Sequence, residues 1–456
     1  MTSSTASATG SVAPVQPTGV PLTAAELAAV RADFPLLQRT VRDGRPLVYL
    51  DTAATAQKPA CVWEAEQDFY ERCNAGVHRG AHQVAEEATE AFESARAAVA
   101  AFVGVGADEL VWTKNATEAL NLVAYGFLNA TLDARLGRGA DLARERFTLA
   151  EGDEIVITEA EHHANLVPWQ ELAARTGARL RWITVTDDGR LDPASFSVIT
   201  ERTRIVALTH ASNVTGAISP VTEVVRRARE ATAGSSAPAL VVLDACQSAA
   251  HLPLDLTALD VDFAAVSAHK MLGPTGVGAL YGRRELLAAM PPVLMGGSMV
   301  ETVTMESTTF AAPPQRFEAG TQMVAQAVGF AAAVGYLAEL GMDRLAAHEA
   351  ELTGLLLDGV ASVPGVRVLG PADTRERLAV VAFEVEGIHP HDVGQVLDDD
   401  GIAVRVGHHC AQPVHRALGA HSSARASAGL YTSAAEVESF IAGLHRVREF
   451  FGGSHV

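Results

Sequence analysis

Residues 263–276 read Phe-Ala-Ala-Val-Ser-Ala-His-Lys-Met-Leu-Gly-Pro-Thr-Gly. A short apolar run typical of a buried strand is followed at once by polar residues and a glycine-rich turn. Upstream, the apolar run Leu240–Asp244 also ends in a polar residue, and short apolar runs alternate with amphipathic segments between Leu47 and Arg283. The other predicted strands are Leu110–Trp112, Glu154–Thr158, Leu180–Val185 and Arg204–Thr209. This alternation predicts an α/β fold with a mostly parallel sheet covered by helices on both faces.

The pattern changes after Thr308, which predicts a smaller α+β unit. Two long helices are expected first, at Met323–Glu339 and Met342–Val360. Strands at Val366–Leu369 and Leu378–Val385 and a final helix at Ala435–Phe451 follow. We therefore predict a flexible tail over 1–21, an N-terminal helix over 22–46 packed on the small domain, a large domain over 47–307 and a small C-terminal domain over 308–456. Residues 129–148 are polar and are expected to form a surface insertion.

Composition and charge favour a globular protein that does not bind nucleic acid. Of the 456 residues, 48% are hydrophobic and 20% are charged, and the formal net charge of -19 opposes binding to a phosphate backbone or an anionic membrane. No apolar run is long enough to span a bilayer, and the first 20 residues lack the basic start and apolar core of a signal peptide. We therefore expect a cytoplasmic protein without a membrane segment.

Lys270 stands out because the chain has only three lysines beside 32 arginines. A lone lysine is usually a solvated loop charge, but a lysine kept at a strand end suggests a need for an amine that can lose its proton. Asp244 ends a neighbouring predicted strand, where a carboxylate among Val and Leu requires a cationic partner. An acid and an amine of this kind are the protein half of pyridoxal phosphate chemistry.

A candidate phosphate cradle lies at residues 111–121, Val-Trp-Thr-Lys-Asn-Ala-Thr-Glu-Ala-Leu-Asn, where a predicted strand runs into a helix. Free N–H groups at a helix start bind anions, and Thr117 adds a hydroxyl. The same pattern also describes an ordinary helix cap. Ser267 and His269, beside the lysine, would complete the cradle.

Paired histidines, His162 and His163, follow the predicted strand 154–158. No acidic or sulfur ligand shares their spacing, so we predict no metal site and expect a flat imidazole against a flat cofactor. The four cysteines Cys61, Cys73, Cys246 and Cys410 are far apart and include no Cys-x-x-Cys pair, which predicts reduced thiols.

These segments together resemble the cysteine desulfurases of the SufS type (group II), which are fold-type I pyridoxal phosphate enzymes of aminotransferase class V. The resemblance extends from about Leu47 to Phe451. The motifs that carry it appear in the family's order as LDTAATAQKP, VHRGAH, NATEALNLVA, EHHANLVPWQ, THASNVTG, VVLDACQ, SAHKMLGPTG, RFEAGT, VRVGHHCAQP and ARAS.

The resemblance implies a role for each of these positions. Lys270 would bond to the cofactor, Asp244 would pair with the pyridine nitrogen and His162 would stack on the ring. Asn213 and Gln247 would contact the ring hydroxyl. The phosphate would lie on Ala116, Thr117, Ser267 and His269, with Thr321 reaching across from the second subunit of a homodimer. Arg425 would bind the substrate carboxylate, and Arg405 would support the wall beside the cysteine loop.

Cys410 would then be the nucleophile, although a free cysteine is more often a small buried apolar residue. The resemblance implies that Lys270 removes the α-proton of L-cysteine and that Cys410 attacks the substrate sulfur, which leaves alanine and a persulfide on Cys410. It also implies transfer of that sulfur to an acceptor of the SufE or SufU type in iron-sulfur cluster assembly. His391 resembles a histidine that exchanges zinc with SufU-type partners, and it is equally well explained as a helix-start residue.

Two features depart from the common family pattern. Residues 428–433 read Ala-Gly-Leu-Tyr-Thr-Ser in place of the usual aromatic and Tyr-Asn-Thr run, and the insertion at 129–148 is longer than in compact relatives. A selenocysteine lyase or cysteine sulfinate desulfinase on the same scaffold is the alternative function. An aminotransferase or kynureninase-like enzyme, and a binding protein that mainly presents Cys410 to an assembly scaffold, are further alternatives.

Overall fold

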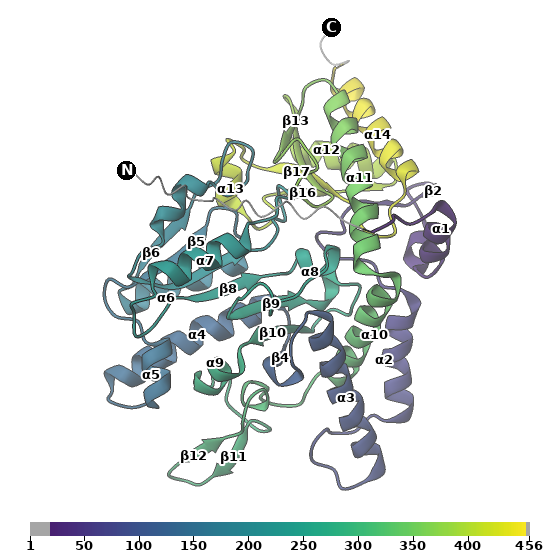
Figure 1. Cartoon of the computed structure of the whole chain (residues 1–456). Helices are drawn as coiled ribbons and strands as arrows, with labels where there is room; N and C mark the ends of the chain where they lie inside the picture. Colours follow the sequence, from purple (N-terminus) through teal and green to yellow (C-terminus); the bar gives the residue numbers. More distant parts are fainter. Residues whose placement is uncertain (1–18, 453–456) are drawn as a thin grey trace, which may run out of the picture.

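The computed structural model describes residues 19–452, so nearly all of the expected tail at 1–21 lies outside the described residues. A seven-stranded sheet in the order β4-β10-β9-β8-β7-β5-β6 forms its centre (Figure 1). The strands from β9 to β6 are parallel, whereas β10 is antiparallel to both β4 and β9. The bounds are β4 Leu110–Thr113, β5 Glu154–Thr158, β6 Arg179–Ile183, β7 Thr203–Thr209, β8 Leu240–Asp244, β9 Phe263–Ser267 and β10 Gly278–Gly282. The predicted α/β fold is confirmed.

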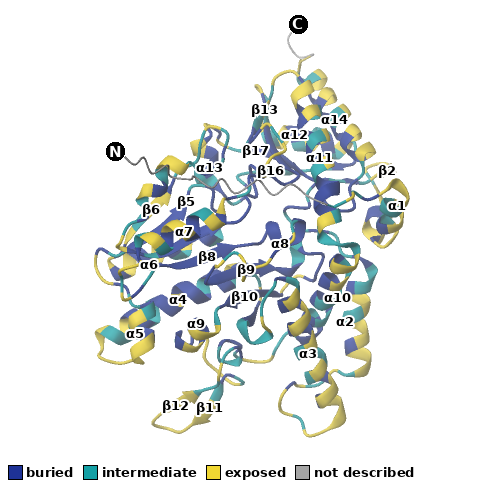
Figure 2. Ribbon diagram, in the orientation of Figure 1, coloured by how far each residue is buried: buried dark blue, intermediate teal, exposed yellow. Residues whose placement is uncertain are grey.

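Helices cover both faces of this sheet, and the central strands are buried apart from Arg204 near the start of β7 (Figure 2). Alternate residues of a strand enter different cores: Val206 and Leu208 pack on one face, and Ile205 and Ala207 on the other. The helices that cover the first face are α2 Ala60–Arg72, α3 Gln83–Phe102, α7 Val221–Ala231 and α10 Val324–Leu340. The helices of the second face are α4 Ala116–Arg135, α5 Asp141–Phe147, α6 Val167–Thr176 and α9 Arg284–Ala289.

A second, antiparallel sheet has the order β13-β14-β17-β16. Its strands are β13 Val366–Leu369, β14 Val380–Val385, β16 Arg405–Gly407 and β17 Ser423–Ser427. One core of this unit is formed with α11 Met342–Ser362, α12 Pro390–Asp399 and α14 Ala434–Gly452. The short helix α13 Gln412–Ala417 packs in a separate cluster with Leu369 and Ala382. β16 ends at Gly407, directly before the loop at residues 408–411, and β17 pairs with β16.

Packing crosses the expected domain boundaries at two places. β3 Val48–Tyr49 pairs in parallel with β15 Ile402–Ala403, and Val48 joins the core of the second sheet. α10 packs instead on the core that contains α2 and α3. Near the N-terminus, α1 Ala24–Ala32 begins with a capping box formed by Thr23 and Glu26. The two-residue strands β1 Thr40–Val41 and β2 Arg45–Pro46 pair after it.

Several elements were not expected from the sequence. β10 is one, and a hairpin of β11 Val300–Val303 and β12 Thr308–Phe310 that projects from the body of the molecule is another (Figure 1). The insertion at 129–148 is helical for the most part, because α4 extends into it and α5 follows. Phe147 at its end is fully buried, which anchors this segment to the core.

Within residues 19–452, no single helix has the length and hydropathy needed to cross a membrane. α10 and α11 meet that requirement only as a pair, and they are bent by 77° relative to each other. Much of α10 is buried among other helices of the same chain, including Phe330, Val334 and Leu337.

Candidate functional site

The carboxyl ends of β8 and β9 open into a cavity of about 240 Å³. This is the edge of a parallel sheet where ligands usually bind. Every residue assigned a role above lines this cavity except Thr321 and His391. The lining includes Ala116, Thr117, His162, Asn213, Asp244, Gln247, Ser267, His269, Lys270, Arg405, Cys410 and Arg425, and in addition Ala53, Ala54, Asn115, Ala164, Thr209, Ala211, Cys246 and His409.

One end of the cavity is formed by the start of α4. Asn115 caps the helix by accepting the Glu118 N–H at 3.0 Å, and the Ala116 N–H donates to Ser267 Oγ at 2.9 Å. Gly278 allows this close approach, because a Cβ at that position would lie 2.7 Å from Asn115 Cα. Thr117 is exposed at the helix start beside the cavity. With the Ala116 and Glu118 N–H groups engaged in these bonds, the N-terminus of α4 offers an anion the positive end of its dipole and the Thr117 hydroxyl.

His269 lies beside this end of the cavity and is held by main-chain contacts. Its carbonyl accepts hydrogen bonds from the Ala56 N–H at 3.0 Å and from Lys58 Nζ at 3.1 Å. Burial and the neighbouring charges of Lys270 and Lys58 lower the pKa of His269 to about 4. The imidazole is therefore neutral at neutral pH and can donate one N–H to an anion.

Asp244 is a buried carboxylate at the end of β8. It is 6% exposed, and Oδ1 accepts the Cys246 N–H at 3.0 Å. Across residues 19–452 Asp244 forms no ion pair with a basic side chain. A carboxylate in such surroundings is complementary to a cationic N–H group of a ligand.

Gln247 and Asn213 line the same part of the cavity. Gln247 Nε2 donates to the Ala53 carbonyl at 3.0 Å, while its buried Oε1 has no partner among the described residues. Asn213 Nδ2 donates instead to the His409 carbonyl at 2.7 Å, which ties the loop after β7 to the cysteine loop. The unpartnered Gln247 oxygen is positioned to accept a hydrogen bond from a ligand hydroxyl.

His162 is neutral and oriented by the backbone. Its Nδ1 accepts the Ala164 N–H at 3.1 Å, so its own proton is on Nε2. Burial and the nearby Lys270 lower the pKa of His162 to about 4. A neutral imidazole fixed in this way offers a flat surface to a ring bound in the cavity.

Glu161, beneath His162, was assigned no role from the sequence. Its carboxyl oxygens meet Thr158 Oγ1 at 2.5 Å, the Thr209 N–H at 2.9 Å and Asn165 Nδ2 at 2.6 Å. Burial raises the pKa of Glu161 to about 8, against the effect of these hydrogen bonds. Glu161 therefore acts as a protonated buried link between β5, β7 and the His162 turn.

Cys410 lies on a constrained turn above the cavity. His409 and Cys410 both have positive φ, at 50° and 58°, a backbone region that residues other than glycine rarely adopt. His163 holds the turn from the other side, since its N–H donates to the Cys410 carbonyl at 2.7 Å and its Nε2 accepts the Gln412 N–H at 3.2 Å. Arg405 Nη2 lies 3.8 Å from Cys410 Sγ, so the thiol has a cation beside it.

Arg425 is a fully buried cation at 1% exposure. Its Nη1 donates to the Asn213 carbonyl at 2.8 Å and its Nη2 to Asp51 Oδ1 at 3.2 Å. The buried Nε has no partner within the described part of the chain. Burial lowers the pKa of Arg425 to about 10, which still leaves it charged at neutral pH. Asp51, in the LDTAATAQKP motif, is a partner that the sequence did not reveal.

Thr321 does not reach this cavity within one chain. It is exposed, and it lines a separate hollow with Lys114, Gln322 and Leu294. Its expected contact across a dimer stays a prediction. Cys246 was assigned no role from the sequence, but it lines the cavity, where its Sγ is 3.9 Å from Ser267 Oγ.

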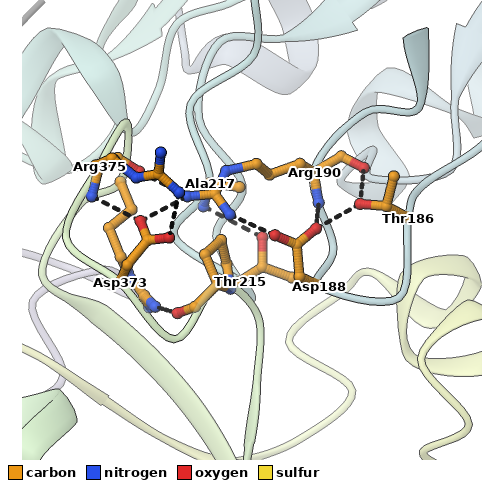
Figure 3. A network of polar contacts seen from close by, with 9 residues as sticks. Thr186, Asp188, Arg190, Thr215, Ala217, Asp373 and Arg375 are labelled. Carbon is orange, nitrogen blue, oxygen red and sulfur yellow. Dashed lines mark hydrogen bonds and ion pairs between the residues drawn. The ribbon is translucent and has the colours of Figure 1, made fainter. Parts of the chain in front are cut away.

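A polar network braces the loop that carries Asn213 (Figure 3). Arg190 Nη2 donates to Asp373 Oδ1 and to the Arg375 carbonyl, both at 2.9 Å, and Arg190 also pairs with Asp188. The Ala217 N–H donates to Thr215 Oγ1 at 3.2 Å in the same region. The segment before β14 is thereby fixed to the loops of the large sheet.

The residues around the cavity fit pyridoxal phosphate. A buried carboxylate suits the pyridine nitrogen, an unpartnered amide oxygen suits the ring hydroxyl, and a helix start suits the phosphate. Lys270 lines the same cavity. No group of three or more His, Cys, Asp or Glu side chains suited to a metal ion occurs in residues 19–452.

Known proteins with similar sequences are cysteine desulfurases. A "Probable cysteine desulfurase 2" of Mycobacterium leprae is 54% identical over 433 residues, which is 95% of this chain and 99% of that protein. A "Probable cysteine desulfurase" of Streptomyces coelicolor is 52% identical and spans 93% of this chain and 97% of that protein. The apo structure of a cysteine desulfurase from Thermococcus onnurineus superposes with a TM-score of 0.83 at 36% identity and covers 93% of this chain and 98% of that one. Residues 48–440 match the family Aminotransferase class-V, and the chain belongs to this family and, within it, to the cysteine desulfurases.

Proposed function

We propose that this enzyme converts L-cysteine to L-alanine with pyridoxal phosphate and leaves the sulfur as a persulfide on Cys410. The observation that carries the proposal is that one cavity is lined by Lys270, Asp244, Arg425 and Cys410. The first two suit the cofactor, Arg425 suits a carboxylate, and Cys410 provides the nucleophile.

Pyridoxal phosphate, when bound, supplies an electron sink for the substrate carbon. Asp244 and Gln247 would hold its ring, and the start of α4 with Ser267 would hold its phosphate. Arg425 would orient the substrate carboxylate through its free Nε–H and neighbouring N–H groups. Lys270 Nζ lines the same cavity and would take the α-proton.

Cys410 would complete the reaction on the substrate sulfur. Its thiol loses a proton, a sulfur–sulfur bond forms, and the substrate carbon–sulfur bond breaks with its electron pair on Cβ. Protonation of Cβ gives alanine. Arg405, 3.8 Å from Sγ, stabilises negative charge on Cys410 before attack.

The test compares wild type with Cys410→Ala and, as a matched control, Cys73→Ala, because Cys73 does not line the cavity. We expect wild type and Cys73→Ala to release alanine from L-cysteine and to carry a reductant-sensitive persulfide, seen as one added sulfur by mass spectrometry. Cys410→Ala should carry no persulfide, and its alanine output should fall to background. Equal alanine output from Cys410→Ala and wild type would contradict the proposal.

We further propose a cytoplasmic homodimer in which Thr321 of one subunit approaches the phosphate site of the other. The exposure of Thr321 outside its own cavity supports this arrangement. A mass of two chains in solution, and loss of cofactor retention in Thr321→Ala, would be the expected results. The division into domains at 47–307 and 308–456 belongs to the same proposal. The expected helix over 22–46 is shorter, because α1 covers only Ala24–Ala32 and the strands β1 and β2 follow it, and Val30 of α1 joins the core that contains α2 and α3.

The proposed destination of the sulfur is an acceptor of the SufE or SufU type in iron-sulfur cluster assembly. His391 is exposed in the first turn of α12, and its ring stacks on His389 with centroids 5.8 Å apart. Its main-chain N–H donates to Nδ1 of His389 at 3.2 Å, so His389 is the side chain that caps α12, and a position at the helix start explains His391 as well as a zinc-exchange role does. If His391 exchanges zinc with the acceptor, His391→Ala should slow persulfide transfer to a zinc-bearing acceptor and leave alanine formation unchanged. If His391 is only a helix-start residue, the substitution should not slow this transfer.

A further inference from the structure

Lys58 is a half-buried lysine that has no part in the reaction proposed above. Its Nζ donates to Thr55 Oγ1 at 3.2 Å, to the Ala56 carbonyl, and to the His269 carbonyl at 3.1 Å. An ammonium group has three donors and no acceptor, so these three oxygens take all of its protons. A compact ammonium suits acceptors that converge on one point better than the planar fork of an arginine, the cation that this chain uses nearly everywhere else.

The charge of Lys58 has no acidic partner. Within residues 19–452 no carboxylate pairs with it, whereas Lys114 pairs with Glu118 at 3.8 Å. The three acceptors of Lys58 are neutral oxygens, and burial lowers its pKa to about 8. The amine is therefore mostly charged at pH 7. A half-buried cation without a counter-charge is complementary to an anionic ligand.

His269 connects Lys58 to the end of the cavity that is formed by the start of α4, here called the anion end. The His269 carbonyl also accepts the Ala56 N–H at 3.0 Å, and Thr55 Oγ1 lies 3.2 Å from that carbonyl oxygen and 3.3 Å from Nδ1 of the ring. This segment therefore holds both the main chain and the ring of His269, which lines the cavity. Burial and the charges of Lys270 and Lys58 together lower the pKa of His269, so the charge of Lys58 acts on this ring.

We propose that Lys58 is a positioning residue for the phosphate of the cofactor, because its ammonium group holds His269 in place and supplies positive charge behind the anion end. The inference rests on the proposed function, which identifies the anion as the phosphate of pyridoxal phosphate. Lys58 does not line the cavity, so it acts through His269 and through its electric field, and the ligand needs no contact with Nζ. Water screens this field only weakly, because the His269 segment lies in between.

The effect of Lys58 depends on pH with a defined sign. Lys58 attracts an anion only while it is protonated, so its contribution is full well below pH 8 and is lost as the pH rises through about 8. His269, the titratable group in contact with Lys58, is neutral in this range because its pKa is about 4. Tyr49 and Tyr431, which hydrogen-bond to the same loop, stay uncharged because burial raises the pKa of both phenols. Lys270 carries a second amine in the cavity, so a variant of Lys58 is needed to isolate the effect.

The first readout is the affinity of full-length, cofactor-free enzyme for pyridoxal phosphate and for pyridoxal, which lacks the phosphate, followed by visible absorbance. In Lys58→Met at pH 7 we expect the affinity for pyridoxal phosphate to fall roughly tenfold and that for pyridoxal to stay unchanged. The difference from wild type should shrink as the pH rises from 7 to 9. Lys58→Arg keeps the charge and should recover most of the loss. Arg72→Met is the control, because it removes one exposed charge at the end of α2.

The second readout is the pKa of Lys58 in wild type, so it does not depend on the folding of a variant. The chain has only three lysines, so carbon-13 labelling of lysine gives three side-chain signals, of which that of Lys58 is lost in Lys58→Met. We expect a titration midpoint near pH 8 in the cofactor-free enzyme. Saturating pyridoxal phosphate should raise it by about one pH unit, because linkage makes this shift equal to the tenfold effect on affinity. Pyridoxal should not move it.

A midpoint that pyridoxal phosphate leaves unmoved, or equal losses of affinity for both ligands in Lys58→Met, would overturn the inference. Equal losses are the result expected of a merely structural role. Both readouts omit L-cysteine, so they are separate from the test of the proposed function. A wild type that binds as expected but forms no alanine contradicts the proposed function and leaves the role of Lys58 standing.

Discussion

At the scale of single residues, the cavity is defined by buried polar groups whose partners come from distant parts of the chain. Arg425 is held by Asp51, and the cysteine loop is held by His163 and Asn213. Each contact fixes a side chain before a ligand binds, so that less ordering is needed during the reaction. The neutral states of His162 and His409 follow from burial near cations, and they make both rings hydrogen-bonding groups rather than charges.

Glu161 gives a prediction on stability and pH. Its pKa is raised from 4.5 to about 8 in the folded protein, so between these values the folded state holds a proton that the unfolded state has lost. The free energy of unfolding should therefore fall as pH rises, by up to about 1.4 kcal/mol per pH unit from this group. Glu161→Gln cannot titrate and should lack this slope.

The measurement is chemical denaturation of both proteins at several pH values between 5 and 8. The Glu161→Gln substitution disturbs one hydrogen bond to Thr158 or Asn165, so the difference between the two slopes is the decisive quantity. Parallel curves over this range would show that Glu161 is ionised in the folded protein.

At the scale of secondary-structure elements, the site depends on where β9, β10 and the start of α4 meet. β10 is antiparallel to β9, and Gly278 at its first position pairs with Ser267 at the end of β9. The absence of a side chain at Gly278 lets α4 begin against the sheet, and this places Ala116 next to Ser267. The geometry of the anion site is therefore set by one close contact between elements.

Gly278→Ala tests this contact. The added Cβ would lie 2.6 Å from the Val266 carbonyl oxygen and 2.7 Å from Asn115 Cα, and backbone atoms cannot move aside easily. We expect a loss of about 1–3 kcal/mol in unfolding free energy and weaker retention of pyridoxal phosphate, followed by visible absorbance. Gly335→Ala is the control, since nothing lies within 4 Å of its Cβ position in α10. A gain of about 0.5–1 kcal/mol is expected there.

At the scale of the whole molecule, the site lies between two packed units. The large sheet supplies Lys270 and Asp244, and the second sheet supplies Arg405 and Arg425. The network around Arg190 joins the loops of the first unit to the segment before β14 of the second (Figure 3). Relative motion of the two units would change the distance between Cys410 and the cofactor site.

Arg190→Ala should therefore weaken the connection between the units. Because Arg190 is only partly buried, we expect a loss of about 1 kcal/mol in unfolding free energy, and a smaller loss at high salt. Arg175→Ala removes an exposed pair within one helix and should cost about 0.3–0.5 kcal/mol. Denaturation at low and high salt measures both variants, and equal losses would argue against a special role for Arg190.

Local sequence patterns were sufficient for most of the elements. The strands Glu154–Thr158, Leu240–Asp244 and Phe263–Ser267 have the predicted bounds, because short apolar runs ending in polar residues carry their own signal. The helices α10, α11 and α14 differ from prediction by one or two residues at their ends. The resemblance to the cysteine desulfurases implied which side chains would share the cavity, and only those at the ends of β8 and β9 also follow from the common edge of parallel strands.

Tertiary structure decided what no local pattern contains. The antiparallel direction of β10 depends on pairing with both β4 and β9, and the Asp51–Arg425 contact joins positions 374 residues apart. The contacts of the Ser423 hydroxyl with Nε2 of His409 and Nε2 of His415, at 2.9 and 3.0 Å, are also invisible in the sequence, because the direction of each hydrogen bond depends on all its partners at once. The sequence by itself determined which chemical groups are present and at which strand ends, whereas long-range packing decided their partners and protonation states, because burial and hydrogen bonding are properties of the assembled fold.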